Sequence, residues 1–256
     1  MQAYPLGQVG YLFEGAAGRI VIDPYLTDSV AEEFGPAFRR LTPPTLGASA
    51  LTGVELVLLT HAHLDHTDPV SLAGIFHSSP DACFAAPYEC HPILESLGIP
   101  QNQLKLVSAG DVWQTPGGVT IRAIPAAHTV LETDANGRSR FLGYHLETPR
   151  LSLYHAGDTV AHETIIESLG GLQIDYAFLP VNECNYFRSV QGIVGNMSPR
   201  EAFGMAELIG ARCLVPTHWD LFSPNSVYPW EVAALHQALQ PAFELRFMPC
   251  GAVYNI

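Results

Sequence analysis

The chain has 256 residues, of which 48% are hydrophobic and 14% are charged, and its formal net charge at pH 7 is −13. This composition predicts a folded chain with a sizeable core, and the negative charge excludes a nucleic-acid backbone as the expected partner, since that partner requires a basic surface. The chain lacks an apolar run of the ~18 residues that a membrane span needs, and its first residues lack the basic region and long apolar stretch that are typical of a signal peptide. Its five scattered cysteines form no CxxC pair. We therefore expect a cytoplasmic protein with free thiols and no membrane partner.

Strand-like segments recur along the chain, and their ends are polar. They cover residues 19–26, 54–63, 118–128, 150–159, 174–183 and 212–220. The side chains at or near their ends include Asp23, His61, His128, Asp158, Asn182 and His218. We expect these ends to meet at one edge of a sheet, where such side chains could form a site.

Helices are expected between several of these strands, over residues 68–76, 163–171, 198–211 and 229–240. Asp68 is the expected cap of the first helix, and Ser198 with Glu201 forms a capping box at the start of the third. The segments 118–124 and 141–148 read as a hairpin-like pair. Strands that alternate with helices in this way predict an α/β (α+β) fold, in which mixed sheets are covered by helices.

Two long segments interrupt the alternation, at residues 27–53 and 184–197. Long loops in compact domains are usually functional or mobile. Neither segment reads as a linker between two folded units, so we expect a single domain over residues 1–256.

The stretch LLTHAHLDHTD, residues 58–68, places three histidines and two aspartates directly after an apolar run. Imidazole nitrogen and carboxylate oxygen are ligands of divalent metals such as zinc. His61 and His63 are two positions apart on an extended strand end, so they point to the same side and can hold one metal ion together. Asp65 and His66 follow where the chain turns, so they can reach a second metal ion nearby.

The string offers too few ligands for two metal ions, so the others must come from other strand ends. The candidates are His128 in PAAHT, Asp158 in HAGDT and His218 in PTHWD. A carboxylate can bridge two metal ions whereas an imidazole cannot, so Asp158 is the expected bridging ligand.

This order of residues, H-x-H-x-D-H followed by a single histidine, a Gly-Asp pair and a final histidine, resembles the ligand order of the metallo-β-lactamase superfamily. The resemblance runs from GYLFEGAAGRIVIDPYL to PTHWD, nearly the whole chain. It implies a four-layer αββα sandwich, with two mixed sheets flanked by helices and two metal ions at one sheet edge. It also implies a first metal site of His61, His63 and His128, and a second of Asp65, His66 and His218, with Asp158 between them.

Several stretches are similar to the L-ascorbate-6-phosphate lactonase-like branch of this superfamily, namely LYHAGDT, IDYAFLPVNE, NMSPREAFGMAELIGARCLVPTHWDLF and SAGDVWQT. This resemblance implies a lactonase-like hydrolase that acts on a small polar ester, lactone or phosphorylated sugar derivative. It also makes manganese the next candidate after zinc for the two divalent metal ions.

The expected reaction is hydrolysis, because a pair of divalent metal ions activates a water molecule near neutral pH. Asp65 is the candidate catalytic residue, since it could orient the nucleophile and move a proton to the leaving group; pure metal ligation is the alternative. One rival function is a phosphodiesterase acting on small or cyclic phosphodiesters. Another, from a different class, is a metal-binding sensor or partner protein that hydrolyses nothing.

Two further residues are expected around the metal ions. In the superfamily, an aspartate placed like Asp23 usually supports the metal ligands, and a turn cap is the alternative. His155 precedes Asp158 by three positions. It is expected either to orient a metal ligand by a hydrogen bond or to be a buried polar residue.

The candidate substrate-binding residues are Asn182, Arg188 and Trp219. Arg188 lies in an aromatic-bearing loop and could clamp an anionic group, as could Arg39 or Arg40 in the other long segment. The alternatives are a solvated surface arginine and a tryptophan packed in the core. We expect a small, polar or anionic substrate as the partner, and edge strands and apolar loops are compatible with a homo-oligomer.

Overall fold

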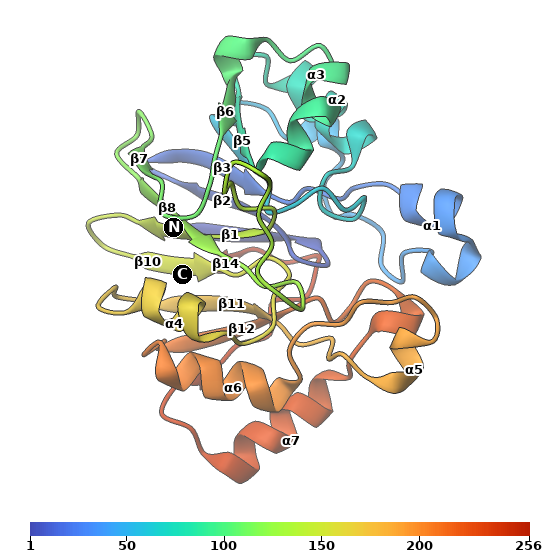
Figure 1. The fold of residues 1–256 in the computed structure, drawn as a ribbon, viewed down its shortest axis with the longest axis vertical. Helices are drawn as coiled ribbons and strands as arrows, with labels where there is room; N and C mark the ends of the chain where they lie inside the picture. Colours follow the sequence, from blue (N-terminus) through green and yellow to red (C-terminus); the bar gives the residue numbers. More distant parts are fainter.

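Two seven-stranded β-sheets face each other in the computed structural model, which describes residues 1–256 (Figure 1). The first sheet has the order β14-β1-β2-β3-β4-β5-β6 and consists of β1 (Gln2–Gly7), β2 (Gly10–Gly15), β3 (Gly18–Ile22), β4 (Leu56–Leu58), β5 (Cys83–Ala86), β6 (Leu104–Leu106) and β14 (Tyr254–Asn255). The second has the order β13-β12-β11-β10-β9-β8-β7 and consists of β7 (Val112–Gln114), β8 (Thr120–Pro125), β9 (Leu142–Glu147), β10 (Ser152–His155), β11 (Tyr176–Pro180), β12 (Cys213–Thr217) and β13 (Glu244–Leu245). Both sheets are mixed, because β3 to β6 and β10 to β13 pair in parallel and the other neighbours pair antiparallel.

Helices cover the outer face of each sheet (Figure 1). Those outside the first sheet are α2 (Pro69–Ser78) and α3 (His91–Ser96), and those outside the second are α4 (Glu163–Leu169), α6 (Pro199–Leu208) and α7 (Pro229–Leu239). The short helices α1 (Ser29–Phe34) and α5 (Tyr186–Ser189) lie toward one edge of the sandwich, in the two long segments. Short 3-10 turns complete the helical elements, at η1 (Pro36–Phe38), η2 (Ala48–Ala50), η3 (Tyr88–Cys90), η4 (Gln101–Gln103) and η5 (Ser223–Asn225). The four-layer αββα sandwich expected from the sequence is confirmed.

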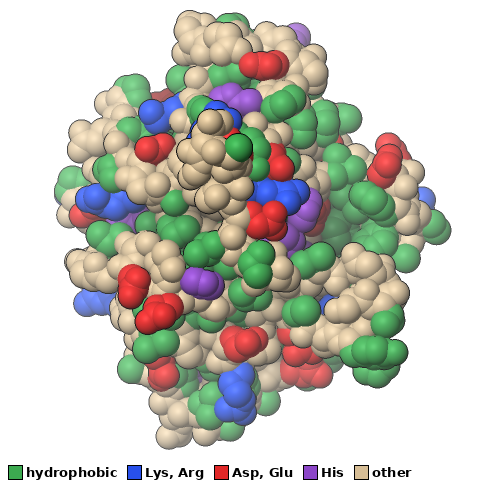
Figure 2. Space-filling model, viewed as in Figure 1, with side chains coloured by type: hydrophobic (Ala, Val, Ile, Leu, Met, Phe, Trp, Pro, Cys, Tyr) green, Lys and Arg blue, Asp and Glu red, His purple; other side chains and the backbone are tan.

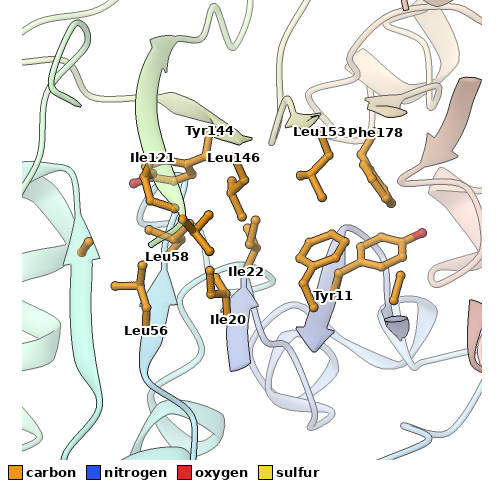
Figure 3. Packing of buried hydrophobic residues seen from close by; sticks show 14 of the residues in the cluster. Tyr11, Ile20, Ile22, Leu56, Leu58, Ile121, Tyr144, Leu146, Leu153 and Phe178 are labelled. Atoms are coloured by element: carbon orange, nitrogen blue, oxygen red, sulfur yellow. The ribbon is translucent and has the colours of Figure 1, made fainter. Parts of the chain in front are cut away.

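The core between the sheets follows from the alternation of side chains along the strands. In β2, Tyr11 and Phe13 belong to the core between the sheets, whereas Leu12 packs in the cluster on the opposite face. Figure 3 shows side chains from the two sheets pointing toward one another. The Tyr144 hydroxyl donates a hydrogen bond to the Leu59 carbonyl at 2.7 Å, which joins the second sheet to the first. Burying each large apolar side chain contributes about 1.5–3 kcal/mol to folding.

Most local predictions are confirmed. Each predicted strand overlaps an observed, shorter one, and the predicted hairpin is the antiparallel pair β8–β9. The capping box of Ser198 and Glu201 is present at the start of α6, and Asp68 caps α2. Sequence analysis did not identify β1, β2, β5, β6, β7, β13 and β14, or the short helices α1, α3 and α5. None of the helices has the length and apolar character to cross a membrane.

Candidate metal centre

The side chains predicted as metal ligands converge beside the carboxyl ends of the central strands. Their candidate ligand atoms lie within 4.8 Å of one another in three overlapping groups, namely His61, His63 and His128; His61, His66 and Asp158; and Asp65, His66 and His218. His61 belongs to the first and second groups and His66 to the second and third, so the three groups form one continuous cluster.

The turn after β4 is held by its own backbone and by the start of α2. The backbone amides of His66 and Thr67 donate to the His63 carbonyl, at 3.0 and 2.8 Å. The Thr67 hydroxyl donates to the His61 carbonyl at 2.6 Å. Asp68 then caps α2 by accepting hydrogen bonds from its first amides. These bonds fix the directions of the side chains in the histidine string before any ligand binds.

Three imidazoles form the first half of the cluster. Nε2 of His61 and Nδ1 of His63 lie 2.9 Å apart. The ring centroid of His128 lies 5.5 Å from that of His61 and 5.1 Å from that of His63. Burial lowers the pKa of all three imidazoles, and the neighbouring His66 and His63 lower that of His61 further. Neutral rings leave nitrogen lone pairs available to a cation.

A carboxylate lies between two imidazoles in the second half. Oδ1 of Asp158 is 3.5 Å from Nε2 of His66, and its Oδ2 is 3.3 Å from Nε2 of His218. Oδ2 of Asp65 lies 3.7 and 3.8 Å from the same two nitrogens. Burial raises the pKa of Asp158, but the imidazoles of His218 and His66 outweigh it and hold the pKa well below its ordinary value. Asp158 is therefore an anion held among imidazoles.

The unpaired atoms of this cluster fit divalent cations. Nε2 of His66 and Oδ1 of Asp158 are buried and have no hydrogen-bond partner. A buried polar atom without a partner costs about 1–3 kcal/mol, and a cation bound by both atoms would remove that cost. Imidazole and carboxylate donors suit zinc, manganese and iron, so the residues fit a divalent metal without selecting one.

Asp23 lies behind His66 and is fully buried. Its Oδ2 lies 2.8 Å from Nδ1 of His66 and accepts a hydrogen bond from the Thr60 hydroxyl at 2.6 Å. Its Oδ1 accepts from the Thr60 amide at 2.8 Å. Because a carboxylate only accepts, Nδ1 of His66 carries the proton, and its Nε2 can offer a lone pair to the cluster. This geometry suits a support for a ligand, the role expected for Asp23 from the sequence.

Gln8 reaches the cluster from the turn between β1 and β2, and sequence analysis missed it. Its Nε2 donates to Oδ2 of Asp65 at 2.8 Å and lies 2.9 Å from Nε2 of His218. The backbone carbonyl of Gln8 accepts a hydrogen bond from the backbone amide of His218 at 2.9 Å. Gln8 and His218 have φ angles of 59° and 60°, which are uncommon outside glycine and concentrate at functional sites. A lone glutamine in the string GQVG carries no ligand spacing that could have marked it.

His155 is fully buried, and its hydrogen bonds go to the backbone. Its Nε2 donates to the Val9 carbonyl at 2.7 Å, and its Nδ1 accepts from the Gly157 amide at 3.3 Å. Burial lowers the pKa of His155, in keeping with a neutral ring that donates through one nitrogen and accepts through the other. His155 thus supports the turn that carries Asp158 through the backbone.

A cavity of about 360 Å³ opens over the cluster. His63, Asp65, His128, Asp158 and His218 contribute to its lining. Its apolar lining comes from α1, η1, the loop after α5 and the segment after β12, with the side chains Val30, Phe34, Phe38, Ile193, Val194 and Phe222. Figure 2 shows histidine side chains beside a hollow with hydrophobic walls, between the parts of the molecule that carry α1 and α5 in Figure 1.

The comparison with known families agrees with this site. A family model described as the beta-lactamase superfamily domain matches residues 18–219, which include all the candidate ligands. The chain belongs to this superfamily.

Similar proteins place this chain more narrowly within the metallo-β-lactamase superfamily. A UPF0173 metal-dependent hydrolase of Pyrobaculum calidifontis is 30% identical over 224 residues, which cover 87% of this chain and 85% of the relative. A probable L-ascorbate-6-phosphate lactonase, UlaG, of Shigella boydii is 26% identical over 259 residues, which cover 96% of this chain and 68% of the relative. These relatives confirm the resemblance to the lactonase-like branch, and the chain is a metal-dependent hydrolase.

Solved structures show the same fold. The crystal structure of an isothiocyanate hydrolase from Delia radicum gut bacteria matches with a TM-score of 0.78 at 17% identity, over 100% of this chain and 99% of the other. At this identity the likeness concerns the fold alone.

Arg188, which we expected to bind the substrate, makes its hydrogen bonds to backbone carbonyls in this hydrolase. Arg188 is buried, and its guanidinium donates to the carbonyls of Glu183 and Ser226, at 2.9 and 2.7 Å. It does not line the cavity. The geometry therefore assigns Arg188 to holding the loop after β11 against the segment after β12, which corrects the expectation of a substrate clamp.

Asn182 does not line the cavity, whereas an asparagine that it contacts does. Asn182 is fully buried and accepts a hydrogen bond from Nδ2 of Asn196 at 2.9 Å. Its own Nδ2 donates to Oδ1 of Asn225 at 3.1 Å, and Asn225 lines the cavity. Asn182 therefore acts on the cavity only through Asn225, which the sequence did not mark because it lies in the η5 turn, far along the chain.

Three other residues expected to bind substrate lie away from the cavity. Trp219 packs against Phe247 with ring centroids 5.3 Å apart and contacts the core beneath the second sheet, as in the alternative considered above. Arg40 donates to the carbonyls of Tyr25 and Leu6. Arg39 is exposed and, like Arg40, does not line the cavity.

Proposed function

We propose that this hydrolase is a dinuclear enzyme that opens small esters or lactones. The observation that carries the proposal is the position of Asp158, which lies 3.5 Å from Nε2 of His66 and 3.3 Å from Nε2 of His218 and shares a ligand group with His61. A carboxylate between two groups of donors is suited to bridge two cations. The choice of esters and lactones follows the name of the relative called a probable L-ascorbate-6-phosphate lactonase.

Each part of the cluster has a role in this proposal. One ion would be held by His61, His63 and His128, and the other by Asp65, His66 and His218, with Asp158 between them. Bound divalent metal ions would supply an activated water molecule and polarise the carbonyl oxygen of the substrate.

The residues of the chain orient the reactants and move the proton. Asp65 lines the cavity with a side chain that is 19% exposed, so its carboxylate can receive a proton from the nucleophile and pass it to the leaving alkoxide. Gln8 holds that carboxylate through its hydrogen bond of 2.8 Å. Asn225 presents an amide to the cavity, which can hold a neutral oxygen of the substrate.

Metal titration tests this proposal. Protein stripped of metal by a chelator is titrated with Zn²⁺ or Mn²⁺, bound metal is measured by mass spectrometry, and the hydrolysis of p-nitrophenyl acetate and γ-butyrolactone is followed. We expect two ions per chain and a rate that reaches its plateau only near the second equivalent. A plateau at one equivalent would contradict the dinuclear proposal.

The same titration separates the rival functions. Faster turnover of bis-p-nitrophenyl phosphate than of the ester and the lactone would favour a phosphodiesterase. Two bound ions without turnover of any of the three compounds would favour a metal-binding sensor.

A further inference from the structure

Much of the wall of the cavity over the candidate metal centre is apolar, and part of this apolar surface is exposed. Ring centroids of Phe34 and Phe38 lie 6.5 Å apart, and those of Phe38 and Phe222 lie 5.9 Å apart, so the three rings form a continuous row. Ile193 and Val194 add apolar surface from the loop after α5. Phe34 is 65% exposed and Val194 is 46% exposed, so this surface can still be buried by a ligand. Figure 2 shows this hydrophobic surface around the hollow.

No lysine or arginine lines this cavity. Arg40 and Arg188 donate to backbone carbonyls, and Arg140 is paired with Glu89 and Glu132 at 2.7 and 2.6 Å. An anionic group that extends away from the metal ions would lose hydration without gaining a partner, which is unfavourable. The net charge of −13 adds no long-range attraction for such a group.

The polar side chains that remain in the walls are neutral. Gln191 and Asn225 line the cavity. Because Oδ1 of Asn225 accepts from Asn182, its Nδ2 is left as a donor. An amide donor can bind an ester or lactone oxygen, but it does not neutralise a phosphate or carboxylate.

We infer that the part of the substrate extending from the reacting ester or lactone is an uncharged apolar group, such as a short alkyl chain or a phenyl ring. The inference rests on the proposed function and narrows it. The sequence led us to expect a polar or anionic substrate, such as a phosphorylated sugar derivative. We now expect a substrate whose remote group is apolar and packs against the row of phenylalanine rings. Each methylene buried there should raise kcat/KM about fourfold until the cavity is filled.

Two esters that differ in one terminal group test the inference. p-Nitrophenyl hexanoate and the mono-p-nitrophenyl ester of adipic acid have acyl chains of equal length, and the second carries a carboxylate in place of the terminal methyl group. We expect the metal-loaded enzyme to have a kcat/KM at least about tenfold higher for the neutral ester, because the carboxylate finds no partner. An equal or higher kcat/KM for the adipate ester would overturn the inference.

A matched pair of variants locates the effect. Phe34→Arg places a cation at the cavity mouth, whereas Leu208→Arg adds the same charge to a side chain of α6 outside the cavity lining. Phe34 and Leu208 are 65% and 69% exposed, so both variants should fold. We expect Phe34→Arg to reduce the neutral-over-anionic ratio about tenfold and Leu208→Arg to leave it unchanged. An unchanged ratio in Phe34→Arg, or an equal change in both variants, would contradict the inference.

Binding without turnover separates this inference from the proposed function. Hexanehydroxamic acid and its ω-carboxylate analogue bind metal ions without being hydrolysed, and titration calorimetry on the metal-loaded protein measures their affinities. Tighter binding of the neutral compound, with no turnover of any ester, would support the apolar cavity and refute the ester hydrolase. Tighter binding of the carboxylate analogue, with ester hydrolysis intact, would refute the apolar inference alone.

Discussion

Oδ2 of Asp23 lies 2.8 Å from Nδ1 of His66, and both side chains are completely buried. This contact joins the end of β3 to the turn after β4 and sets the direction in which His66 presents its other nitrogen. Burial lowers the pKa of His66, but the carboxylates of Asp158, Asp65 and Asp23 raise it well above its ordinary value. The three carboxylates thus favour a positive charge at His66, and a metal cation bound at its Nε2 would supply that charge in place of the proton.

Asp23→Asn should weaken metal binding while the fold persists. The neutral amide would no longer strengthen His66 as a donor, and loss of such a support typically lowers metal affinity about 10–100-fold. Competition against a chromogenic chelator measures the affinity. Asp111→Asn, an exposed aspartate in the turn before β7, is the control and should bind metal like the wild type. Wild-type affinity in Asp23→Asn would mean that Asp23 is only a turn cap.

Asp158→Ala should lose the coupling between the two halves of the cluster. Without that carboxylate, Asp65 is the only carboxylate left beside Nε2 of His66 and Nε2 of His218, and none lies between the two groups of donors, so we expect no more than one tightly held ion per chain. Metal analysis after gel filtration measures the ions that Asp158→Ala retains, and two retained ions would argue against bridging.

His61→Ala should likewise lower the metal content and reduce turnover at least about a thousandfold, as expected when metal chemistry supplies most of the rate. The same metal analysis measures its metal content.

Gln8→Ala should loosen the second half of the cluster. Asp65 and His218 both lose the side-chain amide that contacts them at 2.8 and 2.9 Å, and we expect an approximately tenfold weaker second metal ion. The exposed Gln2 of β1 provides the control variant Gln2→Ala. Equal metal affinity in the two variants would show that Gln8 does not position these ligands.

Arg188→Ala should act on stability and not on the choice between charged and neutral substrates. Two charge-assisted hydrogen bonds to carbonyls are lost from a buried side chain, which should lower the free energy of unfolding by about 2–4 kcal/mol. Urea denaturation measures the loss, and Arg200→Ala, on the exposed face of α6, should change little. A larger rise in KM for the adipate ester than for the hexanoate ester would restore the substrate clamp.

Asp175→Asn should reveal a pH-dependent contribution to stability at the opposite end of the strands from the cluster. Burial raises the pKa of Asp175, but hydrogen bonds from Ser152, Gln173 and Arg212 outweigh it and hold the pKa below 3.8. A lowered pKa stabilises the fold above the unfolded value and loses that effect as the pH falls through the folded value. We expect wild type to exceed the variant by about 1–2 kcal/mol at pH 7 and pH 5, with the difference shrinking below pH 3.8. A difference that grows on acidification would contradict this assignment.

Much of the fold could be predicted because its signals are local. The caps of α2 and α6, the hairpin β8–β9 and the strands that precede the ligands depend on residues close together in the chain. β14 has only two residues and exists through its pairing with β1 at the other end of the chain. The short helices α1 and α5 lie in segments rich in glycine, proline or aromatic residues, where no periodic pattern predicts a helix.

The sequence by itself determined the family, the αββα layers and the identity of the candidate ligands, because the H-x-H-x-D-H spacing and the strand-end residues are properties of short stretches. Only the tertiary structure decided which other side chains reach the cluster and the cavity. Gln8 contacts His218 across 210 positions, Asn225 lines the cavity and Asn182 does not, and Arg188 donates to backbone carbonyls. Such contacts depend on how loops from distant parts of the chain pack and on which partner each buried polar group finds, and no local pattern encodes either.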